Sequence, residues 1–185
     1  MPAFREPPAM SRTPSPLIAS GRPRGGTLLL GAAASLIATS ALAEGDARIT
    51  GLWKLVSYEV EVRSSGEKDP VMGAHPTGYA YFTPEGRVFF NLTGEGRKPA
   101  KDAEGKARLL DTTVSYTGKF TTNGDQWTTR IDTAWNPEWI GTDQTRTFKL
   151  EGQRLQVLTP WRIMPNWAKQ GETRSIVTFE RATDG

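Results

Sequence analysis

The sequence predicts an all-β protein, an eight-stranded up-and-down antiparallel β-barrel that follows an N-terminal leader. Eight segments are rich in β-branched and aromatic residues and are bounded by turn-forming residues, which is typical of strands. The connections between them alternate between very short and long, as they do when successive loops fall on alternate ends of a sheet. No segment after the leader sustains a helical period. The predicted strands cover residues 51–62, 78–83, 87–92, 112–121, 126–134, 143–150, 154–159 and 173–181.

The first 43 residues have the composition of a secretory signal peptide. A basic stretch precedes an apolar segment at 28–37, and Ala41-Leu42-Ala43 forms a small-residue cleavage site. An uncleaved membrane anchor is the alternative, but the segment is rich in Ala, Ser and Thr and barely reaches spanning length. We therefore expect a signal peptide at 1–43 and a barrel domain at 44–185. The mature protein would be exported, either periplasmic or secreted, with no integral membrane span.

Composition excludes several classes of function. The leader holds four of the 23 basic residues and one of the 20 acidic residues, which leaves 19 of each in the rest of the chain. Nucleic-acid-binding domains are normally basic, so we expect no nucleic-acid partner. The chain has no Cys and a single His, His75, which excludes disulfides, the usual zinc sites and Cys–His nucleophile pairs. We expect no metal, no cofactor and no catalytic residue, and we expect His75 to be solvated ahead of Pro76.

The lengths of the connections predict one closed end and one open end. Tight turns are expected at Thr83-Pro84-Glu85-Gly86, Asn123-Gly124 and Glu151-Gly152, where Pro and Gly supply the backbone angles that hairpins need. These turns would share one end of the barrel, which we call the base. The long loops 63–76, 94–111, 135–142 and 160–172 would share the other end, the mouth, with a short helical turn fitting within 94–110. An eight-stranded barrel is filled by side chains or holds one small ligand.

The first two hairpins assign inward faces to their strands. Around Pro84, Tyr81 would face Val88 and Tyr79 would face Phe90, so that these four side chains point inward. Around Asn123-Gly124, the apolar side chains of both strands would also share one face. The expected inward pairs of that second hairpin are Phe120 with Trp127 and Tyr116 with Ile131.

Two further strands are assigned in the same way. Around Glu151-Gly152, Phe148 would face Leu155 and Arg146 would face Val157. In the first strand the apolar pattern follows odd-numbered positions at Trp53 and Leu55 and even-numbered positions from Val56 onward. This change predicts a register shift where a long strand turns a barrel corner.

Arg146 is the strongest candidate for a functional residue. Arg146 lies two residues before Phe148 on the same strand, so both side chains point inward, and Arg146 is in the half of the barrel near the mouth. An unpaired buried guanidinium is costly, so a partner is required. That partner is either a ligand carboxylate, enolate or phenol oxygen, or an internal Asp, Glu or Tyr. Gln144 shares the parity of Arg146 and could assist it.

Aromatic residues complete the predicted ligand-binding set. The interior residues would either pack as core or line a cavity, and their tyrosine hydroxyls would bond to partners or to ligand. The tryptophans of the mouth loops, which include Trp161 and Trp167, would pack on one another, contact ligand or contact a membrane surface. Besides Arg146 and Gln144, the predicted ligand-binding residues are Tyr79, Tyr81, Phe90, Tyr116, Trp127, Phe148, Trp135 and Trp139.

Several stretches resemble the bacterial and fungal lipocalin-like domain family. Gly51-Leu52-Trp53 is similar to the Gly-x-Trp signature that opens the first strand of lipocalins, and Arg181 stands where the family has an Arg that packs across this Trp. Phe179 replaces the Trp of the Trp-Glu-Arg ending that the family often carries. The resemblance implies a calycin-type barrel with a cavity more firmly than it implies an activity. The matching stretches are 51–58, 75–87, 116–120 and 136–146.

The expected function is that of an exported barrel that holds a small hydrophobic or amphipathic molecule with one polar or anionic end. An isomerase- or cyclase-type enzyme acting on a small hydrophobic substrate in the same cavity is the second hypothesis. Such an enzyme would need a titratable base beside Arg146, and the sequence shows none facing inward. A packed structural or interaction module without a ligand is the third.

Overall fold

The computed structural model describes residues 45–183, so the predicted leader and its cleavage site lie outside the described residues. All eight predicted strands are present, with ends that differ by at most two residues from those expected, and the predicted helical turn is a nine-residue helix. The elements are β1 (Gly51–Val62), β2 (Lys68–Asp69), β3 (Thr77–Phe82), β4 (Arg87–Thr93), α1 (Ala103–Asp111), β5 (Thr113–Asn123), β6 (Gln126–Ala134), η1 (Pro137–Trp139), β7 (Asp143–Glu151), β8 (Arg154–Leu158), β9 (Arg162–Ile163), η2 (Pro165–Gln170) and β10 (Glu172–Arg181).

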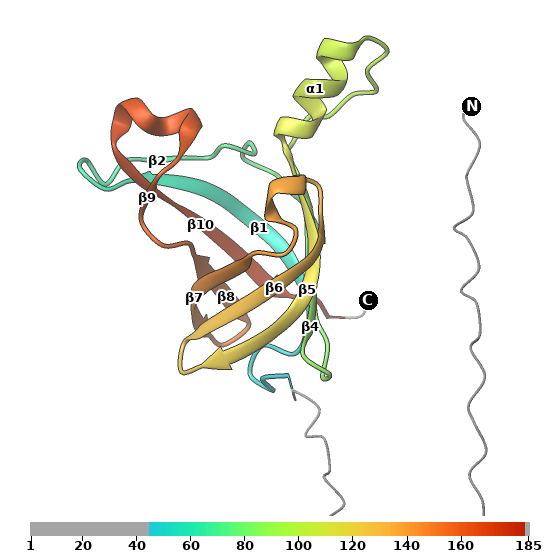
Figure 1. The fold of residues 1–185 in the computed structure, drawn as a ribbon, viewed down its shortest axis with the longest axis vertical. Helices are drawn as coiled ribbons and strands as arrows, with labels where there is room; N and C mark the ends of the chain where they lie inside the picture. Colours follow the sequence, from blue (N-terminus) through green and yellow to red (C-terminus); the bar gives the residue numbers. More distant parts are fainter. Residues whose placement is uncertain (1–44, 184–185) are drawn as a thin grey trace, which may run out of the picture. The chain divides into compact units, whose positions relative to one another are not determined.

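Eight antiparallel strands close into a barrel. They run in the order β1-β3-β4-β5-β6-β7-β8-β10, and β10 pairs back with β1. The two-residue strands β2 and β9 pair with the outer ends of β1 and β10. Because the ring is closed, no long strand in the described residues presents an unpaired edge. Figure 1 shows α1, β2 and β9 at the upper end, the mouth, and the tight hairpin turns at the lower end, the base. No helix among residues 45–183 has the length and apolarity needed to cross a membrane.

The hairpin of β3 and β4 corrects the predicted interior. A hydrogen bond from Gly86 N to Thr83 O (3.2 Å) and one from Thr83 N to Arg87 O (2.8 Å) make the connection a three-residue loop that ends on Gly86 at φ 76°. The sequence predicts a two-residue turn here, and the one-residue difference reverses the faces of β3. Phe82, not Tyr81, therefore stands opposite Val88 inside the barrel. The expectation that Tyr79 and Tyr81 line the interior is wrong, because they lie on the outer face with 49% and 43% of their surfaces exposed.

The other two hairpins keep their predicted faces although their registers differ. Their turn residues are Gly124-Asp125 and Gly152-Gln153, each one position later than expected. This moves the pairing by two residues, which leaves the side chains near each turn on the same face. Phe120 is therefore opposite Thr129 instead of Trp127, and Phe148 is opposite Val157 instead of Leu155. A register shift between Thr117 and Gly118 further along β5 pairs Tyr116 with Ala134 instead of Ile131. The register shift predicted in the first strand is confirmed, between Leu55 and Ser57.

The core fills the half of the barrel near the base with aromatic side chains. Phe82 lies at its centre and makes edge-to-face contacts with Phe90, Phe120 and Trp127 at centroid distances of 5.8, 5.4 and 5.1 Å. Such contacts are favourable beyond the burial of area alone. Trp127 in turn packs on Phe148 at 5.5 Å. Space for a ligand is therefore confined to the half near the mouth.

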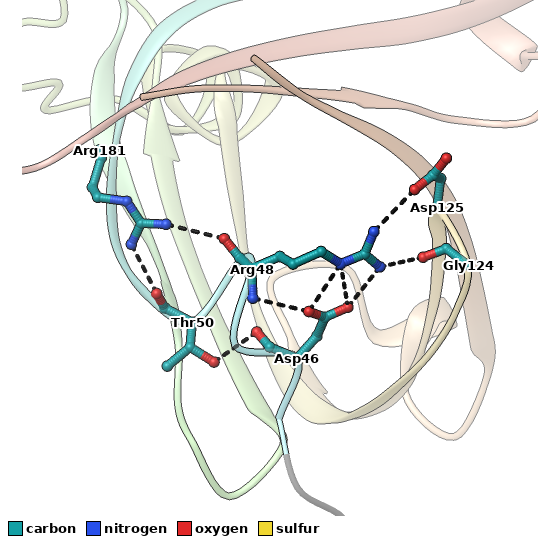
Figure 2. A network of polar contacts seen from close by, with 6 residues as sticks. All are labelled: Asp46, Arg48, Thr50, Gly124, Asp125 and Arg181. Atoms are coloured by element: carbon teal, nitrogen blue, oxygen red, sulfur yellow. Dashed lines mark hydrogen bonds and ion pairs between the residues drawn. The ribbon is translucent and has the colours of Figure 1, made fainter. Parts of the chain in front are cut away.

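Residues 46–50 cover the base, as Figure 2 shows. The guanidinium of Arg48 bonds to the carboxylate of Asp46, to that of Asp125 and to the carbonyl of Gly124. Arg181, at the end of β10, donates to the carbonyls of Thr50 (2.9 Å) and Arg48 (3.0 Å). These contacts join the chain before β1 to the β5–β6 turn and to the last strand.

Candidate functional site

A cavity of about 490 Å³ opens at the mouth of the barrel. This is within the range of small-molecule sites, and most of its lining comes from loops and strand ends. β1 contributes Tyr58, β7 contributes Arg146, and the mouth loops contribute Trp135, Trp139 and Trp167. The strand ends supply a fixed wall, and the loops supply most of the aromatic surface.

Arg146 lies inside the barrel as predicted, with 8% of its surface exposed. β7 directs it inward beside Trp127 of β6, its partner in the ladder. Its Nη1 donates to the carbonyl of Thr145 and its Nη2 to Oε1 of Gln144, both at 2.8 Å. Within the described part of the chain no carboxylate forms an ion pair with it. The internal Asp or Glu considered as a partner is thus not found there, and a buried charge faces the cavity with neutral hydrogen-bond acceptors alone.

Gln144 assists Arg146 but is not part of the cavity wall. It holds Nη2 through its amide oxygen, and its own Nε2 donates to the hydroxyl of Thr142 (3.2 Å). The parity argument thus placed Gln144 correctly beside the guanidinium. Its position makes it a residue that orients Arg146.

Tyr116 and Phe90 line a smaller space next to the main cavity. This space, about 30 Å³, shares Arg146, Tyr58 and Trp139 with it. Tyr116 stacks on Phe90 with centroids 4.6 Å apart and meets Trp139 edge-on at 5.8 Å. Burial raises the pKa of Tyr116 well above its ordinary value, although the positive charge of Arg146 acts in the opposite direction. The hydroxyl is therefore neutral at physiological pH and can serve as a hydrogen-bond donor or acceptor.

The four mouth tryptophans have different roles. Trp135 and Trp139 line the cavity and meet each other at 6.0 Å with rings at 70°. Trp167, in η2, also lines it. Trp161 is not among the lining residues and instead packs under the guanidinium of Arg174, 4.3 Å from its centroid. Mutual packing therefore applies to Trp135 and Trp139, and contact with a ligand stays a prediction for the three tryptophans that line the cavity.

Trp127 and Phe148 lie in the interior as predicted but belong to the core and not to the cavity. They are 1% and 2% exposed, and neither borders the open space at the mouth. On β7, Phe148 lies nearer the base than Arg146, and on β6 Trp127 pairs directly with Arg146. Both rings belong to the aromatic contacts that fill the barrel. They are therefore part of the core beneath the cavity.

Several lining residues were not predicted as ligand contacts. Tyr58 follows the β1 register shift, and its hydroxyl donates to Oγ of Ser175 at 3.2 Å. Its inward parity after that shift was the available signal. Arg162 and Glu138 also line the cavity, from β9 and η1. Burial lowers the pKa of Arg162, and the nearby charge of Arg146 lowers it further.

No group of three or more His, Asp or Glu side chains in residues 45–183 is arranged to hold a metal ion. His75, in the loop before β3, is exposed as expected. The polar groups that line the cavity include guanidinium, hydroxyl, amide and carboxylate groups. Their arrangement suits binding of an organic molecule through hydrogen bonds and charge.

Comparison with known proteins identifies one family. The model of a family described as a lipocalin-like domain matches residues 50–182. Two solved structures with low similarity are a redesigned β-barrel, with 14% identity over 74% of this chain and 93% of that chain (TM-score 0.37), and a point mutant of the fluorescent protein UnaG, with 12% identity over 74% and 98% (TM-score 0.34). Among curated proteins no relative matches.

Proposed function

Because the chain belongs to the lipocalin-like domain family, we propose that it binds one small amphipathic molecule at the mouth of its barrel. The ligand has a mostly apolar body and an anionic end, and Arg146 binds the anionic end. One observation carries the proposal: a guanidinium that is 8% exposed borders a cavity of about 490 Å³ and forms no ion pair with a described residue. A bound anion would offset the cost of keeping this charge out of water.

The magnitudes make the polar contact decisive. A ligand that buries about ten methylenes gains on the order of 8 kcal/mol. Association costs roughly 4–15 kcal/mol, so apolar contact alone gives weak binding. A charge-assisted hydrogen bond contributes about 1.5–3 kcal/mol, which is about a tenfold to hundredfold change in affinity. Anionic and neutral molecules with the same tail should therefore be distinguished by Arg146.

We propose to test this with decanoate and decanol, which share a tail and differ in charge. The quenching of tryptophan fluorescence on titration reports binding, because Trp135, Trp139 and Trp167 line the cavity. Arg146→Ala should weaken decanoate about tenfold or more and leave decanol unchanged. Arg146→Met, which preserves the length of the side chain, guards against a loss of packing. Arg154→Ala on β8, an exposed arginine that does not line the cavity, is the matched control. Equal affinities of decanoate and decanol in the parent protein would overturn the proposal.

We also propose that the barrel works after export, since the basic and apolar segments and the small-residue site at 41–43 support cleavage by a signal peptidase. Mass spectrometry of the protein from its own host tests this. A mature chain that begins at Glu44 supports export, and a retained leader contradicts it.

An isomerase- or cyclase-type activity is the second candidate. It is favoured by the hydroxyls of Tyr58 and Tyr116, which border the same space as Arg146 and could stabilise developing negative charge. No described carboxylate or imidazole hydrogen-bonds to Arg146, and the carboxylates that line the same cavity are those of Glu138 and Asp111. Conversion of a co-purified compound, dependent on Arg146, would favour this candidate. The third candidate is a packed structural or interaction module without a ligand, and failure of every probe to bind would favour it.

A further inference from the structure

Arg162 is the second guanidinium that borders the cavity. Six arginines of the described chain form ion pairs with carboxylates, namely Arg48, Arg63, Arg87, Arg108, Arg130 and Arg174. Five form none with residues 45–183, and of these Arg146 and Arg162 line the cavity, whereas Arg97, Arg154 and Arg181 do not. The one polar contact of Arg162 in that range is a weak approach of Nη2 to Sδ of Met164, at 4.0 Å. The two cavity arginines are thus both without a charged protein partner in the described chain.

The two positive charges are close enough to affect each other. The charge of Arg146 lowers the pKa of Arg162, after the larger effect of burial. Like charges that border the same cavity repel each other, although Arg162 is an exposed residue and water therefore weakens the repulsion. An anion that contacts both guanidiniums would remove the repulsion.

The fold holds Arg162 in position. β9 pairs with β10, with Arg162 opposite Thr173 and Ile163 opposite Glu172. The preceding residue, Trp161, packs under the guanidiniums of Arg174 at 4.3 Å and Arg63 at 5.7 Å. Backbone pairing on one side and a cation–π contact on the other therefore fix the segment that carries Arg162.

Two carboxylates also line the cavity, Asp111 at the end of α1 and Glu138 in η1. Neither comes within ion-pairing distance of Arg146 or Arg162 among the residues that the structure describes. An anionic ligand consequently has no internal ion pair to displace. Contact with both guanidiniums would be opposed by the negative charges of these two carboxylates, so the guanidiniums must lie nearer to the ligand than the carboxylates do.

We propose that Arg162 is a second ligand-binding residue and that, together with Arg146, it selects amphipathic molecules whose polar end carries two negative charges. The inference rests on the proposed function, because it assumes that the anionic end lies at Arg146. The shared chemistry is a dianion attached to an apolar body. A phosphate monoester and a pair of neighbouring carboxylates both satisfy it, and the experiment separates them.

Four probes with the same tail test the proposal: decanol, decanoate, decyl phosphate and decylsuccinate. Titrations at pH 8 keep the phosphate monoester largely dianionic, since its second pKa is about 6. The parent protein should bind at least one of the two dianions about tenfold more tightly than decanoate. Arg162→Ala should weaken that dianion about tenfold and change decanoate and decanol by less than about twofold. Arg162→Gln, which keeps most of the side chain, repeats the test with less loss of packing, and Arg154→Ala serves again as the control.

The outcomes distinguish the two claims. Dianions that bind no better than decanoate overturn the present inference and leave the assignment of Arg146 intact. Decanoate that binds no better than decanol overturns the proposed function. An Arg162→Ala variant that binds all four probes equally weakly, or that changes none of them, shows a structural role and overturns the inference. Preference for decyl phosphate identifies a tetrahedral head group as the source of the dianion, and preference for decylsuccinate identifies separate carboxylates.

Discussion

The guanidinium of Arg181 stacks on the indole of Trp53, with its central carbon 4.2 Å from the ring centroid. Trp53 is fully buried, and its Nε1 donates to the carbonyl of Ile49 at 2.7 Å. Arg181 and Trp53 are also directly paired in the ladder that joins β10 to β1. One cation–π contact thus lies across the seam at which the first and last strands close the barrel.

We expect Arg181→Ala to lower the free energy of unfolding by about 2–3 kcal/mol. The variant loses a cation–π contact of about 0.5–2 kcal/mol and two hydrogen bonds to the carbonyls of Thr50 and Arg48. Arg181→Lys should recover only part of the loss. An ammonium keeps the positive charge but cannot both stack on the ring as a planar group and donate two hydrogen bonds in the geometry of a guanidinium. Urea unfolding measures the stability of both variants through the midpoint of the transition. The dependence of the unfolding free energy on urea concentration should stay the same as in the parent. A midpoint equal to that of the parent would show that the contact does not stabilise the closed seam.

Adjacent residues on β3 should respond very differently to truncation. Phe82→Ala removes a fully buried ring at the centre of the aromatic core and should cost about 3–5 kcal/mol. Tyr81→Ala removes an exposed ring whose partners across the strands are Leu52 and Phe89, and should cost less than about 1 kcal/mol. Comparing the free energies of urea unfolding of the two variants shows which of the two side chains lies inside the barrel. Costs in the reverse order would support the two-residue turn instead of the three-residue loop.

This pair also shows how much of the fold could be predicted from the sequence. The strands and their order were predictable because each is bounded by turn chemistry and because turn and loop lengths alternate. Pro84 and Gly86 fit a two-residue turn and a three-residue loop equally well, and the choice between them is made by the hydrogen bonds that the folded hairpin forms. An error of one residue there moved Tyr79 and Tyr81 to the wrong face. In the β5–β6 and β7–β8 hairpins the predicted pairing was wrong by two residues, which left the side chains near the turns on their predicted faces.

The candidate site was predictable to the extent that it lies on long strands. Arg146 and Gln144 follow from the alternation along β7, and Tyr116 follows from that along β5. Arg162 lies in a two-residue strand within a mouth loop, and no pattern of two residues defines an inward face. Loop residues reach the cavity through contacts that are distant in sequence, such as the packing of Trp161 on Arg174.

Asp46 should make the base sensitive to acid. Hydrogen bonds from Arg48 lower the pKa of its carboxyl group below the ordinary value of 3.8, although burial acts in the opposite direction. A lowered pKa in the folded state contributes stability above the unfolded pKa, and this contribution is lost as the pH falls through the folded value. Asp46→Asn should therefore cost about 1–3 kcal/mol at pH 7, and its difference from the parent should shrink below about pH 4.

Urea unfolding at a series of pH values measures this dependence. Asp125→Asn is the matched control, because Asp125 also pairs with Arg48 but its side chain is 74% exposed. It should change stability by less than about 1 kcal/mol at every pH. A difference between Asp46→Asn and the parent that stays constant from pH 7 to pH 3 would contradict the assignment.

The closure of the ring by the β1–β10 pairing has a consequence for engineering. Trp53, Arg181 and the aromatic core are held by strands and tight turns at the base, whereas Trp135, Trp139, Met164 and Trp167 reach the cavity from mouth segments. Trp139 also packs against the core, so the other three mouth positions are the ones to combine in a library that leaves the seam unchanged. The same scaffold could then be retargeted to new guests, with Arg146 retained as a constant anchor or replaced to invert the preferred charge.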